Sequence, residues 1–214
     1  MQSFINYMAN AQTRHNVFIS YHHKNDQYYK ERLLTLNTAH KIFIDKSVDS
    51  SEIDDDLPDE SIRRIIRNDF LSDSSVTILL VGTETQRRKH IDWEIYSSMY
   101  DGAVNKKSGI LVINLPSINC SCYTATHSGE KERIYPETTD WCSITSREEY
   151  ESRYPYMPGR IIDNLLVKGM KISVVPWSKI EGCPQNLRFL VDAAHADRTS
   201  CEYDLSTPMR RANS

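Results

Sequence analysis

The chain has 214 residues, a length that predicts one domain with elaborations. Hydrophobic residues make up 39% and charged residues 26% of the chain, which is typical of a folded globular protein and excludes a disordered tail. With 26 basic and 29 acidic residues the formal net charge is −3, so no overall positive field favours nucleic acid binding. The seven glycines fit neither G-x-G-x-x-G nor a P-loop, which excludes both phosphate-binding motifs.

The five cysteines indicate free thiols, because their number is odd and no C-x-x-C pair is present. Cys120, Cys122, His127 and Cys142 are conceivable metal ligands, but their irregular spacing favours thiols in a loop, and we expect no metal. The first 16 residues do not have the pattern of a signal peptide. The longest apolar run is four residues, against about 20 for a membrane span, so we expect a cytoplasmic protein that binds no membrane.

The first third of the chain predicts two strand–helix pairs. A polar N-terminal arm over residues 1–15 precedes an apolar, β-branched run at 15–20, which predicts a strand. Apolar side chains then recur at helical spacing over 26–37. A second short strand is predicted at 41–45, and a proline followed by an isoleucine stripe predicts a helix over 58–70.

The middle and end of the chain continue this alternation. Residues 75–82 form the clearest strand, since a near-continuous apolar run is typical of a strand covered on both faces. A helix over 90–99 and a strand over 109–115 follow. A strand at 170–175 and a helix at 184–196 close the pattern.

Strand and helix patterns become weak between residues 116 and 157. We interpret this segment as a long insertion with a short helix near 146–152. A short helix is predicted at 158–166 after the insertion. Residues 16–197 are therefore expected to form the domain, and 198–214 to be a frayed C-terminal tail.

Strands and helices that alternate five times predict an α/β fold of the flavodoxin-like class, with a five-stranded parallel sheet and helices on both faces. In such sheets ligands bind beyond the carboxyl ends of the strands. Here that rim gathers residues 20–23, 45–49 and 82–85 with the N-terminus of the helix predicted at 90–99. A functional site is expected there.

Glu94 is the candidate catalytic residue on this rim. Its helix buries Ile91 and Ile95, and Glu94 lies about 100° around the helix from Ile95, in the first turn or so. A carboxylate there can stabilise a developing positive charge. The alternative is that Glu94 only complements the helix dipole, as acidic residues in first turns often do.

Four further rim residues have both a binding and a structural interpretation. Ser20 and Tyr21 end the first strand, where they can hold a phosphate or a base, or only form a turn. Phe18 is more typical of a core, and Asp45 either binds a ribose hydroxyl or ends its strand.

Two further features of the sequence bear on a metal or partner site and on a phosphoacceptor site. A run of acids without an intervening base indicates a solvated loop and helix start, although a metal or a basic partner stays open: Glu52, Asp54, Asp55, Asp56, Asp59 and Glu60. A phosphoacceptor receiver domain is excluded, because the first strand ends Ser-Tyr-His-His and the third ends Val-Gly-Thr, without the required acids.

Three segments in this order resemble the TIR-like domains of the bacterial Thoeris anti-phage defence system: Val17-Phe-Ile-Ser-Tyr21, the strand with its preceding serines at 74–82, and Ile91-Asp-Trp-Glu-Ile95. The resemblance covers about residues 16–175 and weakens in the insertion. The Arg-Asp-x-x-Pro-Gly loop and the Phe-Trp box of animal TIR domains are missing, which argues against adaptor-type signalling through those surfaces.

The resemblance implies cleavage of NAD at the nicotinamide–ribose bond and formation of an ADP-ribose messenger, expected to be cyclic, which activates a partner effector. It implies that Glu94 is catalytic and that Phe18, Ser20 and Tyr21 line the NAD pocket. Trp93 either shapes that pocket or points into the core. NAD is then a substrate, no cofactor is required, and activation or homo-oligomer assembly is left open. The alternative is a non-catalytic TIR-like interaction module.

Overall fold

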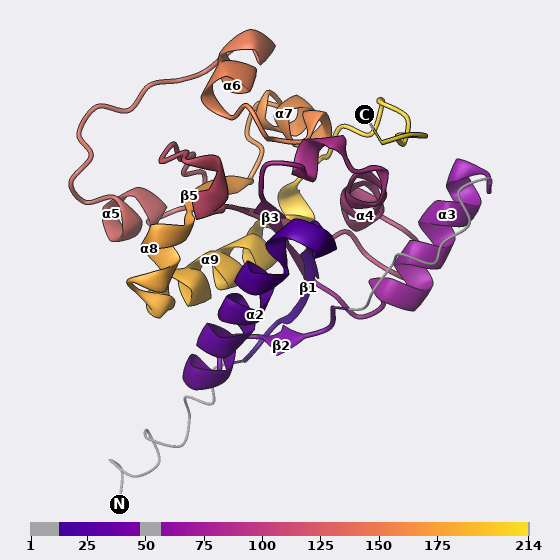
Figure 1. Ribbon diagram of the computed structural model, residues 1–214, viewed down its shortest axis with the longest axis horizontal. Helices are drawn as coiled ribbons and strands as arrows, with labels where there is room; N and C mark the ends of the chain where they lie inside the picture. The colour runs from indigo at the N-terminus through magenta and orange to yellow at the C-terminus, as the bar shows by residue number, and fades with distance from the viewer. Residues whose placement is uncertain (1–12, 48–56, 214) are drawn as a thin grey trace, which may run out of the picture.

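Five parallel strands form one sheet in the computed structural model, which describes residues 13–47 and 57–213 (Figure 1). The strand order is β2-β1-β3-β4-β5, and all four pairings are parallel. The strands are β1 (Asn16–Ser20), β2 (Ile44–Asp45), β3 (Val76–Val81), β4 (Gly109–Asn114) and β5 (Ser173–Pro176). This is the doubly wound order of flavodoxin-like folds, and it confirms the predicted fold class.

Helices connect and cover the strands. They are α2 (His23–His40), α3 (Asp59–Ile65), α4 (Lys89–Met99), α5 (Glu130–Ile134), α6 (Arg147–Arg153), α7 (Gly159–Leu165), α8 (Trp177–Glu181) and α9 (Pro184–Asp197). Helix α3 continues directly into a π-helical segment, Ile66–Phe70. No helix within the described ranges has the length and apolar character needed to cross a bilayer.

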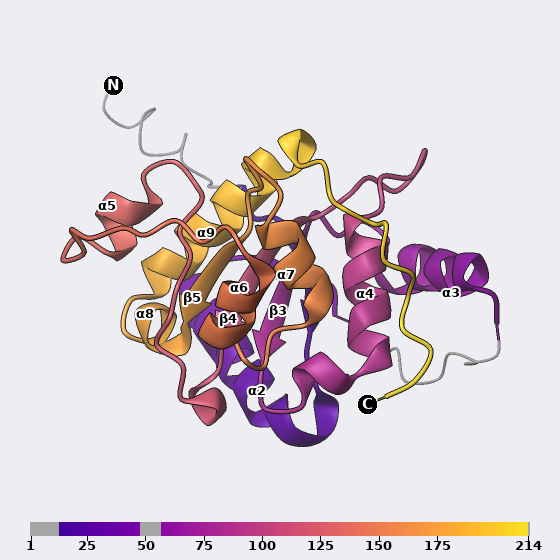
Figure 2. The same ribbon diagram turned by 90° about the horizontal axis from the view of Figure 1, so that it is seen from above.

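The two faces of the sheet carry different helices. One apolar cluster joins β1, β3 and β4 to α2, α8 and α9, and a second joins β3, β4 and β5 to α4 and α7. Figure 2 shows the two helix layers on either side of the strands. Successive side chains of a strand point to opposite faces. Val17 and Ile19 therefore lie in the first cluster, while Phe18 packs with Trp93 of α4 on the other face.

The insertion packs on the outer edge of the sheet. Thr124 and Val174 exchange two backbone hydrogen bonds of 2.9 Å, so the insertion covers the edge strand β5. Its helix α6 begins one residue after the start predicted from the sequence, and the Ser146 hydroxyl caps it by accepting a hydrogen bond from the Glu149 amide. Between α5 and α6 the chain forms an extended connection on the outside of the domain (Figure 1).

Strand β2 is shorter than the predicted run of 41–45. The side-chain oxygen of Asn37 accepts hydrogen bonds from the amides of Ile42 (3.1 Å) and Phe43 (2.8 Å). Those two amides are therefore bound to the end of helix α2, and only Ile44 and Asp45 pair with β1. A local side-chain contact overrides the apolar pattern here.

The expectation of a frayed C-terminal tail is wrong. The tail runs beside α4 and α7 in both views (Figures 1 and 2). Met209 is buried in the cluster that holds Phe18 and Trp93, and the Arg210 carbonyl accepts a 2.7 Å hydrogen bond from the Trp93 indole. The tail lacks a regular hydrophobic period because backbone groups, and not a helical stripe, hold most of it in place.

Candidate functional site

The carboxyl ends of the strands carry a buried serine–glutamate pair. The Ser20 hydroxyl, at the end of β1, donates a 2.6 Å hydrogen bond to Glu94 Oε2 on helix α4. Ser20 is 1% exposed and Glu94 is 4% exposed. The sequence predicts both residues for this rim, and the structure brings them into direct contact.

The strand and helix patterns explain why these two side chains meet. Ser20 lies two residues after Phe18, so both point to the sheet face that α4 covers. Glu94 is the sixth residue of α4 and lies between the buried residues Trp93 and Ile95. Glu94 therefore lies past the first turn of α4, in which Asp92 is the acidic residue. An acidic residue that only complements the helix dipole does not need to be buried, whereas Glu94 is buried.

Phe18 and Trp93 lie beneath this pair and not on an open surface. Both belong to an apolar cluster with Ile62, Ile66 and Met209, and Trp93 is fully buried. In this conformation they support β1 and α4 through packing. Of the two interpretations that the sequence left open for each residue, the core position is the one observed.

Tyr21 and Asp45 occupy the same rim and have local partners. The Tyr21 hydroxyl donates a 2.5 Å hydrogen bond to Gln27 Oε1 on α2, and its ring stacks on His23. Asp45 is exposed, and its carboxylate accepts hydrogen bonds from the amide and the hydroxyl of Ser47. The Ser47 hydroxyl also accepts a bond from the Ile19 amide, which links the end of β2 to β1.

Asp26 is a rim residue that the sequence analysis did not single out. It lies in the first turn of α2, is 2% exposed, and packs against Gly82 at the end of β3. One carboxylate oxygen, Oδ2, has no hydrogen-bond partner among the described residues. Desolvation by burial raises the pKa of this carboxyl to about 6. The glycine that directly follows an apolar strand was the available signal, because it permits a close approach.

An arginine clamp holds the start of α4 next to Glu94. The Arg160 guanidinium forms two hydrogen bonds with the Asp92 carboxylate, at 2.8 and 3.0 Å. Arg160 also donates to the carbonyls of Thr207 and Pro208, and the Arg210 amide donates to Asp92 Oδ2. Helix α7, helix α4 and the tail are thereby joined at one carboxylate.

Metal ligands do not gather in the described part of the chain. No three histidine, cysteine or acidic side chains of residues 13–47 and 57–213 lie close enough to hold an ion. His127, considered with the cysteines above, instead contacts Asp197 at 2.7 Å. All five cysteines are free thiols. Of the acidic run, Glu52, Asp54, Asp55 and Asp56 lie outside the described residues.

A sheet of order β2-β1-β3-β4-β5 with a glutamate of α4 bound to the end of β1 is consistent with a TIR-like domain of the flavodoxin-like class. Residues 18–119 match the family described as Thoeris protein ThsB, TIR-like domain. This part of the chain is therefore a ThsB TIR-like domain, which is defence-related, and the resemblance predicted from the sequence is confirmed. No curated protein matches the chain.

Proposed function

We propose that this domain cleaves NAD at the nicotinamide–ribose bond, with Glu94 as the catalytic residue. The proposal is carried by the Ser20–Glu94 hydrogen bond at the carboxyl-end rim of a ThsB-type domain. Ligands of doubly wound sheets bind at this rim. A buried carboxylate fixed by a hydroxyl is a preorganised negative group, which is the kind of group that stabilises a cationic transition state.

The reaction requires little acid catalysis. The C–N bond breaks with its electron pair going to the nicotinamide ring, which leaves as a neutral molecule, so no general acid protonates it. Positive charge develops on the ribose as an oxocarbenium-like centre. Glu94 faces that charge, and Ser20 positions the Glu94 carboxylate. Water attack gives linear ADP-ribose, and attack by a hydroxyl of the same molecule gives a cyclic product; in both cases the attacking oxygen releases its proton.

The reaction includes an opening step. Because Glu94 is only 4% exposed, a dinucleotide reaches its carboxylate after the surrounding elements of the rim separate. The domain is therefore inactive in this closed conformation and becomes active on an infection cue. The product then acts as a second messenger, expected to be a cyclic ADP-ribose, that switches on a partner effector.

Nicotinamide release from NAD tests the proposal, with cells under phage challenge as the activated state. Glu94→Gln removes the negative charge at nearly constant shape, and we expect a rate loss of about 10²–10³-fold. Ser20→Ala leaves the carboxylate but removes its fixed donor, and we expect a smaller loss. Glu60→Gln on α3, whose side chain is 87% exposed, is the matched control and keeps wild-type activity.

Full activity of Glu94→Gln would exclude the proposed role. Chromatography of the nucleotide products of the active protein then distinguishes linear from cyclic ADP-ribose. A linear product alone would exclude the cyclic messenger while leaving NAD cleavage intact.

The near-complete burial of Glu94 favours a second candidate, a non-catalytic TIR-like interaction module. In that case the Ser20–Glu94 bond only joins β1 to α4. Glu94→Gln and Ser20→Ala would then lower thermal stability, and phage-challenged cells with the wild type would release no nicotinamide. Size-exclusion chromatography with light scattering tests self-assembly directly.

A further inference from the structure

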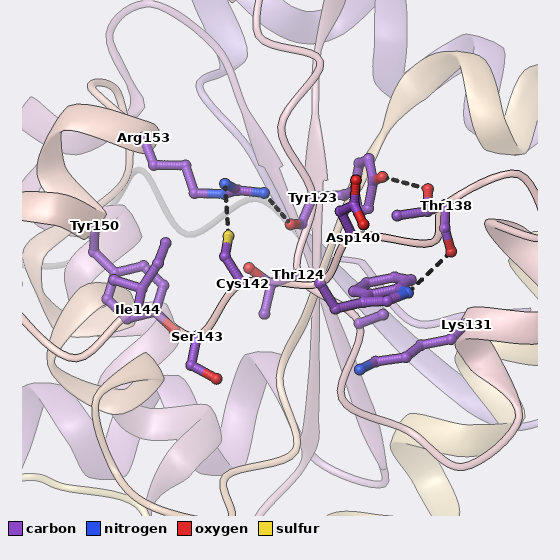
Figure 3. Close-up of a pocket in the computed structure, with 12 residues that line it drawn as sticks. Tyr123, Thr124, Lys131, Thr138, Asp140, Cys142, Ser143, Ile144, Tyr150 and Arg153 are labelled. Atoms are coloured by element: carbon purple, nitrogen blue, oxygen red, sulfur yellow. Dashed lines mark hydrogen bonds between the residues drawn. The ribbon is translucent and has the colours of Figure 1, made fainter.

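A second site is formed within the insertion. A cavity of about 280 Å³ lies between α5, α6 and the chain that joins them (Figure 3). Its lining comes from residues 123–153, beyond the end of the segment that matches the ThsB family at 119. Glu94 does not line this cavity. The function of this cavity is therefore separate from the NAD cleavage proposed for the rim.

The cavity has a rigid aromatic wall. The Trp141 indole N–H donates a 3.1 Å hydrogen bond to the Thr138 carbonyl, and its ring contacts Tyr123 and Tyr135 edge-on. Tyr123 is itself stacked on Tyr135 with ring centroids 3.9 Å apart, and its hydroxyl is 2.6 Å from Thr138 Oγ1. These contacts fix the plane of a partly exposed indole before any ligand arrives, which lowers the entropic cost of stacking.

Two cations line the same cavity. Lys131 Nζ lies 4.3 Å from the centroid of the Trp141 ring. The Arg153 guanidinium points into the cavity from α6, where it donates to the Tyr123 carbonyl at 3.0 Å and contacts Cys142 Sγ at 4.0 Å (Figure 3). Within residues 13–47 and 57–213 neither cation forms an ion pair with a carboxylate. Their charges are available to an anionic ligand.

One carboxylate, Asp140, completes the lining. It carries a charge opposite to that of the two cations, so the cavity does not suit a ligand that is anionic throughout. A carboxylate beside a phosphate-binding group can accept hydrogen bonds from sugar hydroxyls. The cavity thus combines a flat aromatic surface, a hydroxyl acceptor and two cations that have no ion pair with a carboxylate among the described residues.

We propose that this cavity is a binding site for a ribonucleoside monophosphate. The base stacks on the Trp141 indole, Asp140 accepts hydrogen bonds from the ribose, and Lys131 and Arg153 hold the phosphate. Small-molecule pockets span roughly 300–1,000 Å³. The volume of this cavity, about 280 Å³, lies just below that range and suits a mononucleotide better than a dinucleotide. The insertion is then a nucleotide-sensing element attached to the edge of the sheet.

Isothermal titration of the full chain with AMP, adenosine and inorganic pyrophosphate separates the contribution of the phosphate from the joint contribution of the base and the ribose. We expect AMP to bind with a Kd below about 1 mM, and each of the other two to bind at least tenfold more weakly. Trp141→Leu removes the stacking surface and Lys131→Ala removes one cation. Each is expected to weaken AMP binding by roughly tenfold or more. Lys168→Ala, an exposed lysine outside the cavity, is the matched control and leaves binding unchanged.

Each result either supports or overturns the proposed nucleotide site in the insertion. Glu94→Gln must retain AMP binding, since otherwise the nucleotide occupies the rim. Equal binding of AMP and pyrophosphate, unaffected by Trp141→Leu, would leave a simple anion site and overturn the proposal. No heat of AMP binding up to about 10 mM with the wild type would overturn it also. The thermal unfolding midpoints of the variants, compared with that of the wild type, show that the insertion stays folded.

Discussion

Gly82 and Asp26 meet at the carboxyl-end rim so closely that a methyl group on Gly82 would overlap both carboxylate oxygens of Asp26. The glycine directly follows strand β3, and the aspartate lies in the first turn of α2. The absence of a side chain at position 82 is thus what allows α2 to begin directly above the sheet. This contact predicts a packing effect for substitutions at Gly82 and a pH dependence of stability at Asp26.

Gly82→Ala should lower the free energy of unfolding by about 1–3 kcal/mol, as overpacking of a filled site does. Because the clash is with a side chain, Asp26→Ala should recover most of that loss in the double variant. Urea unfolding of the four proteins of this cycle measures the coupling. Gly109→Ala is the contrasting control. Its new methyl group would overlap the backbone of Ala194, and no side-chain substitution at 194 can remove that overlap. Additive effects of the two substitutions at 82 and 26 would contradict the contact.

Asp26 should give the domain a specific pH dependence. Its folded-state pKa is raised from 3.8 to about 6, so the folded protein holds this proton more tightly than the unfolded chain. The stabilisation is fully present below about pH 4 and is lost as the pH rises through about 6. At one pKa unit per 1.36 kcal/mol, the loss reaches at most about 3 kcal/mol.

Asp26→Asn removes the ionisable group, so the pH-dependent loss of stability at this position disappears. We expect the stability of the variant relative to the wild type to increase between about pH 4 and pH 7. Thermal unfolding at a series of pH values measures the difference. Asp69→Asn, at an exposed position, is the control for the loss of a surface carboxylate and is measured over the same series of pH values. A pH-independent difference for Asp26→Asn would contradict the raised pKa.

Arg160→Ala should destabilise the domain more than Arg147→Ala does. The Arg160 side chain is 2% exposed, and its loss leaves the Asp92 carboxylate without its charge partner, at a cost of about 3–5 kcal/mol. The tail should also detach, since Thr207 and Pro208 lose their donor. Limited proteolysis followed by mass spectrometry detects cleavage within the tail.

Arg147→Ala is the matched control for the clamp. Arg147 is 42% exposed and pairs with Glu151 and Asp163, a surface arrangement whose loss costs about 1 kcal/mol or less. Equal destabilisation by the two substitutions, or a tail that resists proteolysis in Arg160→Ala, would contradict the clamp.

Asn37→Ala should destabilise the turn between α2 and β2. The substitution leaves the amides of Ile42 and Phe43 without their acceptor, and an unsatisfied buried donor costs about 1–3 kcal/mol. Thr35→Ala on the exposed side of the same helix controls for changes in helix propensity. Chemical unfolding of both variants measures the difference, and similar midpoints would argue against the role of Asn37.

The regular part of the fold could be predicted from the sequence because its signals are local. Strands β3 and β4 are buried at every position and therefore consist mostly of apolar residues. Helix α4 has an apolar stripe that faces the sheet. The meeting of Ser20 and Glu94 follows from the same logic, since a strand end and a neighbouring helix start share one rim of a parallel sheet.

The remaining features depend on contacts between residues that are distant in sequence. Strand β2 is shortened by one asparagine of the preceding helix. Short helix α8 directly follows β5, and no separate periodic stretch marks it. The burial of Asp26 depends on a glycine 56 residues away, and the tail is held by an arginine 47 residues before Thr207. No local pattern predicts such pairs.

The position of the tail has a consequence for synthesis of the protein. Arg160 of α7 binds the Asp92 carboxylate together with residues 207–210, and Trp93 finds its hydrogen-bond acceptor at residue 210. A growing polypeptide on the ribosome can form the central strands early, but the α4 side stays incomplete until residues 207–210 have left the exit tunnel. A chain that stops before residue 207 would therefore lack the contacts that hold the start of α4 beside the Ser20–Glu94 pair.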